Sequence, residues 1–133
     1  MYVRYVIAIV AVILSIASAS ADDSSEMKCV EGGNQPQLNF CAADAFKKAD
    51  KEMNDLYKEQ MTHLKATHKA RLRESQRAWV VFRDKACLYE AGLQQESGSI
   101  WPLDQYMCLE QHTKQRIEDL NSYVACREDG CPE

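Results

Sequence analysis

Polar and reactive side chains surround a tryptophan in one stretch of the chain, and their spacing is that of a helix. Gln76 and Arg83 lie one turn to either side of Trp79, and Cys87 follows one turn later. Steps of three and four residues place side chains on one helical face. A buried amide and guanidinium need hydrogen-bond partners on a neighbouring element, because unpaired burial costs several kcal/mol. The stretch predicts a core helix with a satisfied polar network. The alternative is that Gln76, Arg83 and Asp84 bind a ligand.

Side chains for catalysis or metal binding are less well arranged. His63 and His68 are about 140° apart around a helix, so they cannot share a metal ion as an i, i+4 pair can. His112 is isolated in the sequence, and no Cys-x-x-Cys occurs to suggest a zinc ribbon or a thioredoxin-type site. Ser97 and Ser99 have no base near them in sequence. We therefore expect no enzyme, no metal and no cofactor.

Residues 1–21 have the pattern of an export signal. Arg4 supplies a positive charge, residues 6–16 an apolar segment, and Ala19-Ser20-Ala21 the small residues that a signal peptidase requires. The apolar run is shorter than the roughly 20 residues that span a bilayer. Cleavage after Ala21 is expected, which leaves residues 22–133 as one domain in the periplasm or outside the cell. All six cysteines follow the signal, which in an exported chain predicts three disulfides.

The pattern beyond the signal predicts an all-α fold, a disulfide-stapled bundle of three helices. Residues 22–37 should form an irregular arm, and a first helix should run from about Asn39 to Leu64. A turn at residues 65–68, with Thr67 as N-cap, avoids one helix about 80 Å long with an exposed apolar stripe. Gly98 is expected to end the second helix, and Pro102 suits the start of a third, which runs over residues 103–125. A short C-terminal tail follows.

Cysteine pairing follows from this layout. Cys87 and Cys108 should lie level on antiparallel helices, about two turns from the connecting loop, so they form the first predicted bridge. Their disulfide should stabilise the fold by roughly 3 kcal/mol. Cys41 can take Cys29 from the arm, which leaves Cys126 with Cys131. Six cysteines allow fifteen pairings.

Charge is distributed unevenly along the chain. The segment of residues 47–93 is net positive, and the segments on both sides of it are net negative. Cations gather around the predicted turn, at Lys65, Lys69, Arg71, Arg73 and Arg77. A solvated turn is the simpler interpretation, and a surface for anionic lipid or wall polymer is the alternative. Nucleic acid is not an expected partner of an exported acidic chain.

At this point the chain resembles a known family. The segment SQRAWVVFRDKAC, residues 75–87, is similar to the core signature of the LprI-like lysozyme-inhibitor domain of exported bacterial proteins. The rest of the family pattern appears in order from about residue 29 to residue 121. It is carried by Asn39 and Cys41, by Asp50, Asn54 and Tyr57, by Gly98-Ser99-Ile100, and by Cys108, Thr113, Arg116 and Leu120. Trp101 departs from the small residue usual before Pro, and Cys126 and Cys131 lie beyond the pattern.

The resemblance implies a binding protein that inhibits lysozyme and has no enzymatic activity. The alternative from a different class is an envelope structural or stress protein that contacts anionic lipid or wall polymer. A membrane surface is the less favoured partner. The resemblance also singles out eight motif residues, which we expect to be structural: Asp50, Asn54, Tyr57, Gln76, Trp79, Arg83, Asp84 and Arg116.

The loop before the third helix is the candidate lysozyme-binding surface. Ile100 and Trp101 are apolar groups in a polar segment, and Glu96 adds negative charge. Gly98 permits backbone angles that other residues resist, and Ser99 lies between these groups. Animal-type lysozymes are basic and bind polysaccharide in an acidic cleft, so we expect this loop to cover or enter that cleft. The alternative is that Ile100 and Trp101 only cap the bundle.

Overall fold

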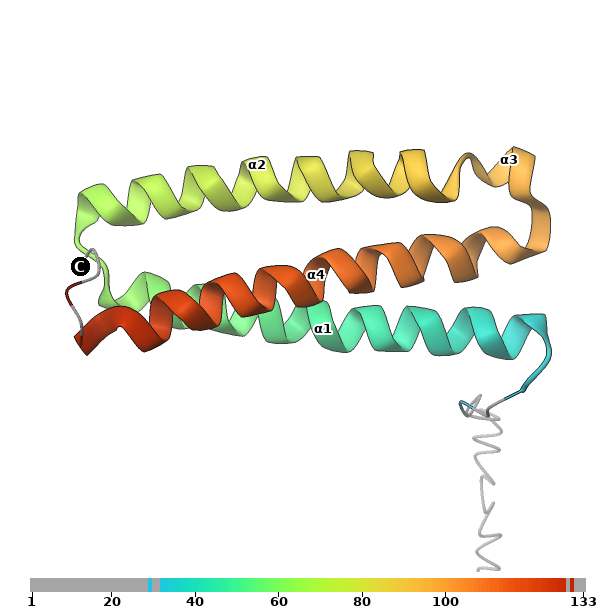
Figure 1. The fold of residues 1–133 in the computed structure, drawn as a ribbon, viewed down its shortest axis with the longest axis horizontal. Helices are drawn as coiled ribbons and strands as arrows, with labels where there is room; N and C mark the ends of the chain where they lie inside the picture. The colour runs from blue at the N-terminus through green and yellow to red at the C-terminus, as the bar shows by residue number, and fades with distance from the viewer. Residues whose placement is uncertain (1–28, 30–31, 129, 131–133) are drawn as a thin grey trace, which may run out of the picture.

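The computed structural model describes residues 29, 32–128 and 130. Within these ranges the chain is helical and has no strand, which confirms the all-α prediction. Three long helices follow one another in antiparallel order (Figure 1): α1 (Gln35–His63), α2 (Ala66–Ala91) and α4 (Trp101–Ala125). Short helices complete the fold, namely α3 (Gln94–Ser97) and the 3-10 helices η1 (Gly98–Ile100) and η2 (Cys126–Glu128).

Helix α1 begins earlier than predicted. Asn34 is its N-cap, and the Asn34 side chain accepts a hydrogen bond of 3.1 Å from the backbone N–H of Gln37. The Gln37 side chain accepts one of 2.9 Å from the Asn34 N–H in return. Pro36 lies in the first turn, where its missing N–H costs nothing. This capping box extends the helix into residues that were expected to belong to the irregular arm.

The turn between α1 and α2 lies where it was predicted, but its capping residue differs. Leu64 and Lys65 are both extended, and Lys65, not Thr67, is the N-cap of α2. Lys65 caps the helix without a side-chain hydrogen bond. Leu64 is buried in the core. Burial of that side chain, in place of an N-cap hydroxyl, therefore holds this turn.

The other end of α2 was also predicted at the wrong glycine. Gly92, with φ of 69°, is the C-cap, and α2 ends at Ala91. A positive φ favours glycine, because a Cβ resists this conformation. Gly98, with φ of 63°, is instead the C-cap of α3 and the first residue of η1. Helix α4 then starts at Trp101 with Pro102 in its first turn, close to the expected position.

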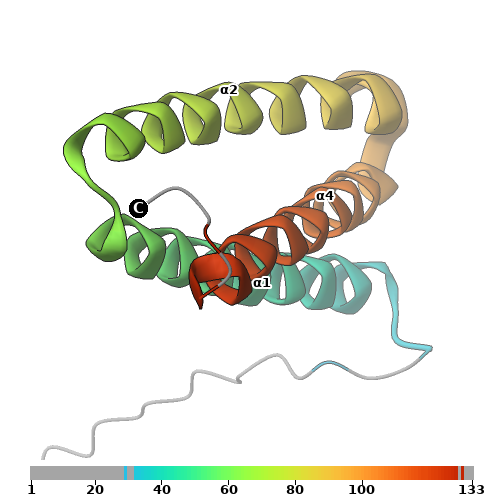
Figure 2. The same ribbon diagram turned by 60° about the vertical axis from the view of Figure 1, so that its left-hand side comes forward.

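The three helices are not equally close to one another. Helices α1 and α4 make the most extensive contact, and α2 packs mainly on α4 (Figure 2). One apolar cluster near the α1–α2 turn contains Ala49, Met53, Leu64, Leu72, Ile117 and Leu120, with Trp79 packed against it. A second cluster, nearer the α3 end, contains Cys87, Cys108 and Leu109, with Phe46 and Tyr106 packed against it.

Disulfides connect the described elements as predicted. Cys87–Cys108 joins α2 to α4, with Cα atoms 5.6 Å apart, within the usual range. Cys29–Cys41 ties the arm to α1. Cys126 also takes part in a disulfide, and Cys131, its predicted partner, lies outside the described residues. None of the described cysteines is free.

The predicted export signal, residues 1–21, also lies outside the described residues. In the part of the chain that the structure covers, the helices are too short or too polar to cross a bilayer.

Candidate functional site

A buried arginine links the three long helices near the middle of the bundle. Arg83 of α2 donates from Nη1 to Asp50 Oδ1 of α1 at 3.1 Å. The same nitrogen lies 3.4 Å from Thr113 Oγ1 of α4. Arg83 Nε and Nη2 both reach Asp84 Oδ1, at 3.0 and 2.9 Å. Asn54 Nδ2 donates to the other oxygen of Asp50 at 3.0 Å. The guanidinium is therefore held by two carboxylates and a hydroxyl.

A second buried arginine makes an equivalent set of contacts closer to the α1–α2 turn. Arg116 of α4 donates from Nε to Gln76 Oε1 of α2 at 3.0 Å. Its Nη1 reaches Asp119 at 3.3 Å, and its Nη2 reaches Ser75 Oγ at 3.5 Å. The amide of Gln76 uses its donor side as well, with Nε2 3.5 Å from Met53 Sδ. Gln76 thus connects α2 to both other long helices.

Trp79 lies between the two guanidinium groups. The ring is 5.2 Å from the Arg83 guanidinium carbon and 5.9 Å from that of Arg116. Cations within about 6 Å of an aromatic face are attracted by the ring quadrupole. The indole is partly buried and packs on the apolar cluster near the turn. One tryptophan therefore holds both arginines in place and also contributes to the core.

These contacts have a direct chemical consequence. Each arginine directs its N–H groups at carboxylates, a hydroxyl or an amide oxygen from the protein itself. A buried guanidinium satisfied in this way has little capacity left for a ligand. Asp84 differs, because its side chain is 55% exposed. The network is suited to holding helices together, and its carboxylates Asp84 and Asp119 are accessible from outside, because their side chains are 55% and 51% exposed.

The loop between α2 and α4 is held by hydrogen bonds to backbone oxygens, unlike the arginine network in the middle of the bundle. Asn39 Nδ2 of α1 donates to the Ser99 backbone oxygen at 3.0 Å, which ties the loop to α1. The indole Nε1 of Trp101 donates to the Gly92 oxygen at 3.0 Å, and the ring is partly buried. Ile100 is 44% exposed, and Glu96 is also exposed. Trp101 therefore braces the loop from beneath, and Ile100 is its exposed apolar group.

A shallow acidic groove runs along α4 from this loop. Its volume is about 630 Å³. Four carboxylates line it, from Glu90, Asp104, Glu110 and Glu118. The one lysine among its lining residues, Lys114, is paired with Glu110 at 2.6 Å. The groove is therefore net negative and continues the acidic character of the loop.

A cavity at the opposite end of the bundle is apolar and lies beside basic residues, in contrast to the acidic groove. Its volume is about 390 Å³, and apolar Leu64, Leu72 and Tyr123 form much of its wall. His68 and Arg71 stand at the same wall, beside the basic turn predicted from sequence. The two ends of the bundle therefore differ in both charge and hydropathy.

Comparison with known proteins settles the family. The family model described as lysozyme inhibitor LprI matches residues 26–120, most of the chain. The chain belongs to the LprI lysozyme-inhibitor family. It is also 29% identical over 117 residues to an uncharacterized protein of Rhizobium meliloti (strain 1021), covering 78% of this chain and 84% of that protein. No solved structure matches the chain.

The structure brings most motif residues of this LprI chain into one network. Asp50, Asn54, Gln76, Trp79, Arg83, Asp84 and Arg116 all belong to it through the contacts given above. Tyr57 instead packs against the apolar cluster near the turn. The five loop residues proposed to contact a partner lie together at the other connection, some distance along α2 and α4 from the network (Figure 1).

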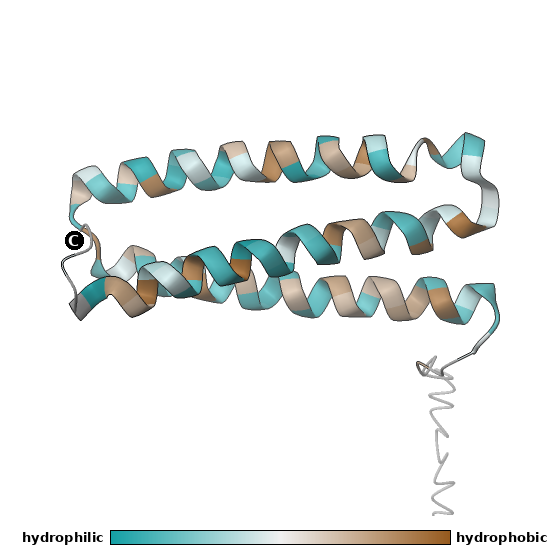
Figure 3. Ribbon diagram, in the orientation of Figure 1, coloured by the Kyte–Doolittle hydropathy of each residue, from teal (hydrophilic) through white to brown (hydrophobic). Residues whose placement is uncertain are grey.

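Sequence reasoning missed an exposed apolar surface on α2, outside the Gln76–Arg83 face. Val81, Phe82, Leu88 and Tyr89 are at least half exposed, and Tyr89 is 90% exposed. Figure 3 shows apolar bands recurring along α2 between hydrophilic ones. Steps of one, six and seven residues place these side chains away from the Gln76–Arg83 face. This second apolar spacing is present in the sequence, but the prediction followed the Gln76–Trp79–Arg83 face instead.

Proposed function

We propose that this LprI chain is an exported binding protein that inhibits lysozyme by covering its substrate cleft. The family match supports the target. The acidic groove beside the α3–η1 loop is the observation that carries the proposal. Export is supported by the predicted signal in residues 1–21 and by the disulfides. The inhibition is non-enzymatic, because the motif side chains bind one another and leave little capacity for catalysis.

The groove fits a basic partner. Its carboxylates extend along α4 from Asp104, close to Ile100, to Glu118, and Glu96 adds negative charge in the loop. Complementary charge accelerates encounter and orients the two proteins. Animal-type lysozymes are basic outside their cleft, so the groove would contact the rim of the cleft. This contact would bring the loop toward the catalytic centre.

The loop supplies the group that enters the cleft. Ile100 projects from η1, and Trp101 and Asn39 hold the backbone beneath it through the bonds to Gly92 and Ser99. A braced loop loses little conformational entropy when it binds. Lysozyme catalysis requires two carboxylates to flank the scissile glycosidic bond. An apolar side chain placed between them and solvent blocks the polysaccharide.

The test is lysis of a bacterial wall suspension, followed by turbidity with lysozyme and the purified protein at low and high salt. Ile100→Ala removes the loop contact, and Glu110→Lys together with Glu118→Lys reverses the groove charge. Glu52→Lys together with Glu74→Lys, at exposed positions outside the groove, is the control with the same change in net charge. We expect salt-sensitive inhibition that both groove and loop changes weaken by roughly 10-fold or more, which corresponds to about 1.4 kcal/mol.

Each other outcome has a clear meaning. Full inhibition by the loop and groove variants, with folding intact, moves the contact surface elsewhere on the chain. Equal loss of inhibition with the Glu52→Lys and Glu74→Lys control means that only net charge matters. Absence of inhibition by the wild-type protein rejects the proposed function.

The basic end of the molecule supports a second candidate, contact with anionic lipid or wall polymer. Arg71, Arg73 and Arg77 are exposed on α2, beside the apolar cavity of about 390 Å³. Cosedimentation with anionic vesicles tests it, with Lys69→Glu and Arg73→Glu as variants. Binding that both changes abolish favours this candidate, and absence of sedimentation with vesicles or isolated walls rejects it.

A further inference from the structure

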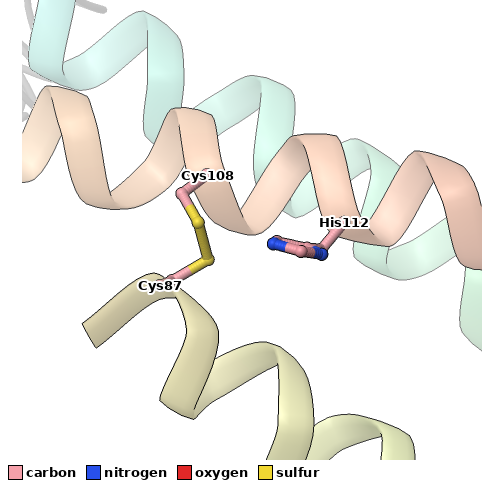
Figure 4. A group of neighbouring side chains, drawn as sticks. All are labelled: Cys87, Cys108 and His112. Carbon is pink, nitrogen blue, oxygen red and sulfur yellow. A yellow bond between two sulfur atoms is a disulfide. The ribbon is translucent and has the colours of Figure 1, made fainter. Parts of the chain in front are cut away.

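The Cys87–Cys108 disulfide lies beside two more side chains of types that bind metal ions. One ligand atom from each of Cys87, Cys108 and His112 lies within 4.8 Å of the others (Figure 4). Glu90 completes the group. Its Oε1 is 3.1 Å from His112 Nε2, and its Oε2 is 3.3 Å from Cys108 Sγ. Two sulfurs and an imidazole therefore lie together, and a carboxylate contacts one of the sulfurs and the imidazole.

Helix geometry explains the convergence. Cys108 and His112 are four residues apart on α4, and Cys87 and Glu90 are three apart on α2. Both spacings place the two side chains on the same helical face. The disulfide sets the relative height of the two helices, so the two pairs face each other. The ring of Phe82 packs edge-on against His112, with centroids 5.7 Å apart, and restricts its orientation.

We propose that this group binds zinc, or a divalent ion of similar ligand preference, when Cys87 and Cys108 are reduced. Two thiolates, one imidazole and one carboxylate make the four-ligand set that zinc accepts in tetrahedral sites. Thiolates also discriminate against hard ions such as magnesium and calcium. Cys87 is completely buried and Cys108 nearly so, so the two sulfurs are shielded from water, whereas the Glu90 side chain is 49% exposed and an ion can enter from that side.

The redox step balances with a dithiol as the reductant. The dithiol gives two electrons and two protons to the Cys87–Cys108 bond and becomes a cyclic disulfide. The two protein thiols then lose their protons as the ion binds, because only the thiolate is a metal ligand. Disulfide and ion use the same sulfurs, so they exclude each other. Both link α2 to α4, so the ion replaces the covalent connection at the same place.

The test uses cobalt(II) as a spectroscopic probe and zinc as the competing ion. The protein is the full chain with the four other cysteines changed to serine, so that only Cys87 and Cys108 remain. It is reduced with a dithiol, freed of reductant under inert gas and titrated with cobalt. We expect thiolate-to-cobalt charge transfer and the visible bands of a tetrahedral ion, at one ion per chain. The oxidised protein should show neither, and zinc should displace the cobalt.

Matched substitutions identify the other two ligands. His112→Gln should weaken zinc binding by at least roughly 10- to 100-fold, the loss that changes to residues just outside the ligand shell already cause. His63→Gln, at the exposed end of α1, should leave the affinity unchanged. Glu90→Gln should weaken binding, while Glu74→Gln, exposed on α2, should not. Zinc should also slow the return of the disulfide, measured as thiols that persist in air.

Three results would overturn the proposal. The first is a reduced protein without tetrahedral cobalt absorption. The second is His112→Gln that binds zinc as tightly as the parent. The third is binding of equal strength by the oxidised protein, which would place the ion elsewhere. If reduction removes the helical circular dichroism signal, zinc should restore it, and failure to restore it counts against the site.

Discussion

Arg116 Nε on α4 lies 3.0 Å from Gln76 Oε1 on α2, and both side chains are buried. This hydrogen bond crosses between two helices at a place where apolar side chains could have met instead. A buried hydrogen bond to a charged donor contributes about 1.5–3 kcal/mol, and an unpaired buried guanidinium costs more. The pair therefore contributes to stability and also specifies which face of α2 turns toward α4.

Two replacements of Gln76 with side chains of similar size should show how much its hydrogen bond contributes to stability. Gln76→Leu leaves Arg116 Nε without its acceptor, so we expect a loss of roughly 2–3 kcal/mol in the free energy of unfolding. Gln76→Glu keeps an acceptor oxygen and should be clearly more stable than Gln76→Leu. Urea unfolding followed by circular dichroism measures both. Equal stability of the leucine variant and wild type would show that the bond is dispensable.

Trp79→Ala should be a folding mutation. The indole packs on the apolar cluster and lies against both Arg83 and Arg116. Loss of a large aromatic side chain at such a place should cost about 3 kcal/mol. Tyr89→Ala is the control, since Tyr89 is on the same helix and exposed. It should change stability by less than about 0.5 kcal/mol. A melting temperature of Trp79→Ala close to that of wild type would contradict the core role.

The sequence predicted the parts of the fold that follow from spacing alone. The face with Gln76, Trp79 and Arg83 was readable because helical periodicity is a strong signal. The Cys87–Cys108 bridge followed from the lengths of two antiparallel helices. The helix ends were harder to predict. Asn34 and Gly92 are caps because of their backbone conformation, and other asparagines and glycines in the chain were equally plausible caps from sequence. The meeting of His112 with Glu90 was not predictable, because it depends on the rotation of α4 relative to α2.

Removal of the Cys87–Cys108 bridge should lower stability without changing the fold. The bridge closes a loop with a sequence separation of 21 residues. Constraining a chain over that length stabilises by roughly 3 kcal/mol. The double serine variant should therefore unfold at lower urea while keeping its helical spectrum. A non-reduced digest of wild type should contain the linked peptides, and a free thiol at either position would contradict the pairing.

The one carboxylate with a lowered pKa is an exposed group on α1, among the residues that the structure describes. A hydrogen bond from Lys51 lowers the pKa of Asp55 below its ordinary value, and the charges of Lys51 and Lys58 add to the effect. A carboxyl group whose pKa is lower in the folded state stabilises the fold at pH values above its unfolded-state pKa. This stabilisation is lost as the pH falls through the folded-state pKa. Carboxyl NMR titration should show the lowered pKa, and Lys51→Ala should move it back upward. An unchanged titration in the variant would refute the pairing.

The looser packing of α2 has a consequence for how the molecule opens. Helices α1 and α4 make the most extensive contact, whereas α2 is held by a few side chains and one disulfide. Amide hydrogens exchange through the local opening that costs the least free energy. In the reduced protein we expect α2 amides to exchange well before those of α1 and α4. Helix α2 would then be the first cooperative unit to detach, and it would leave the α1–α4 pair in place.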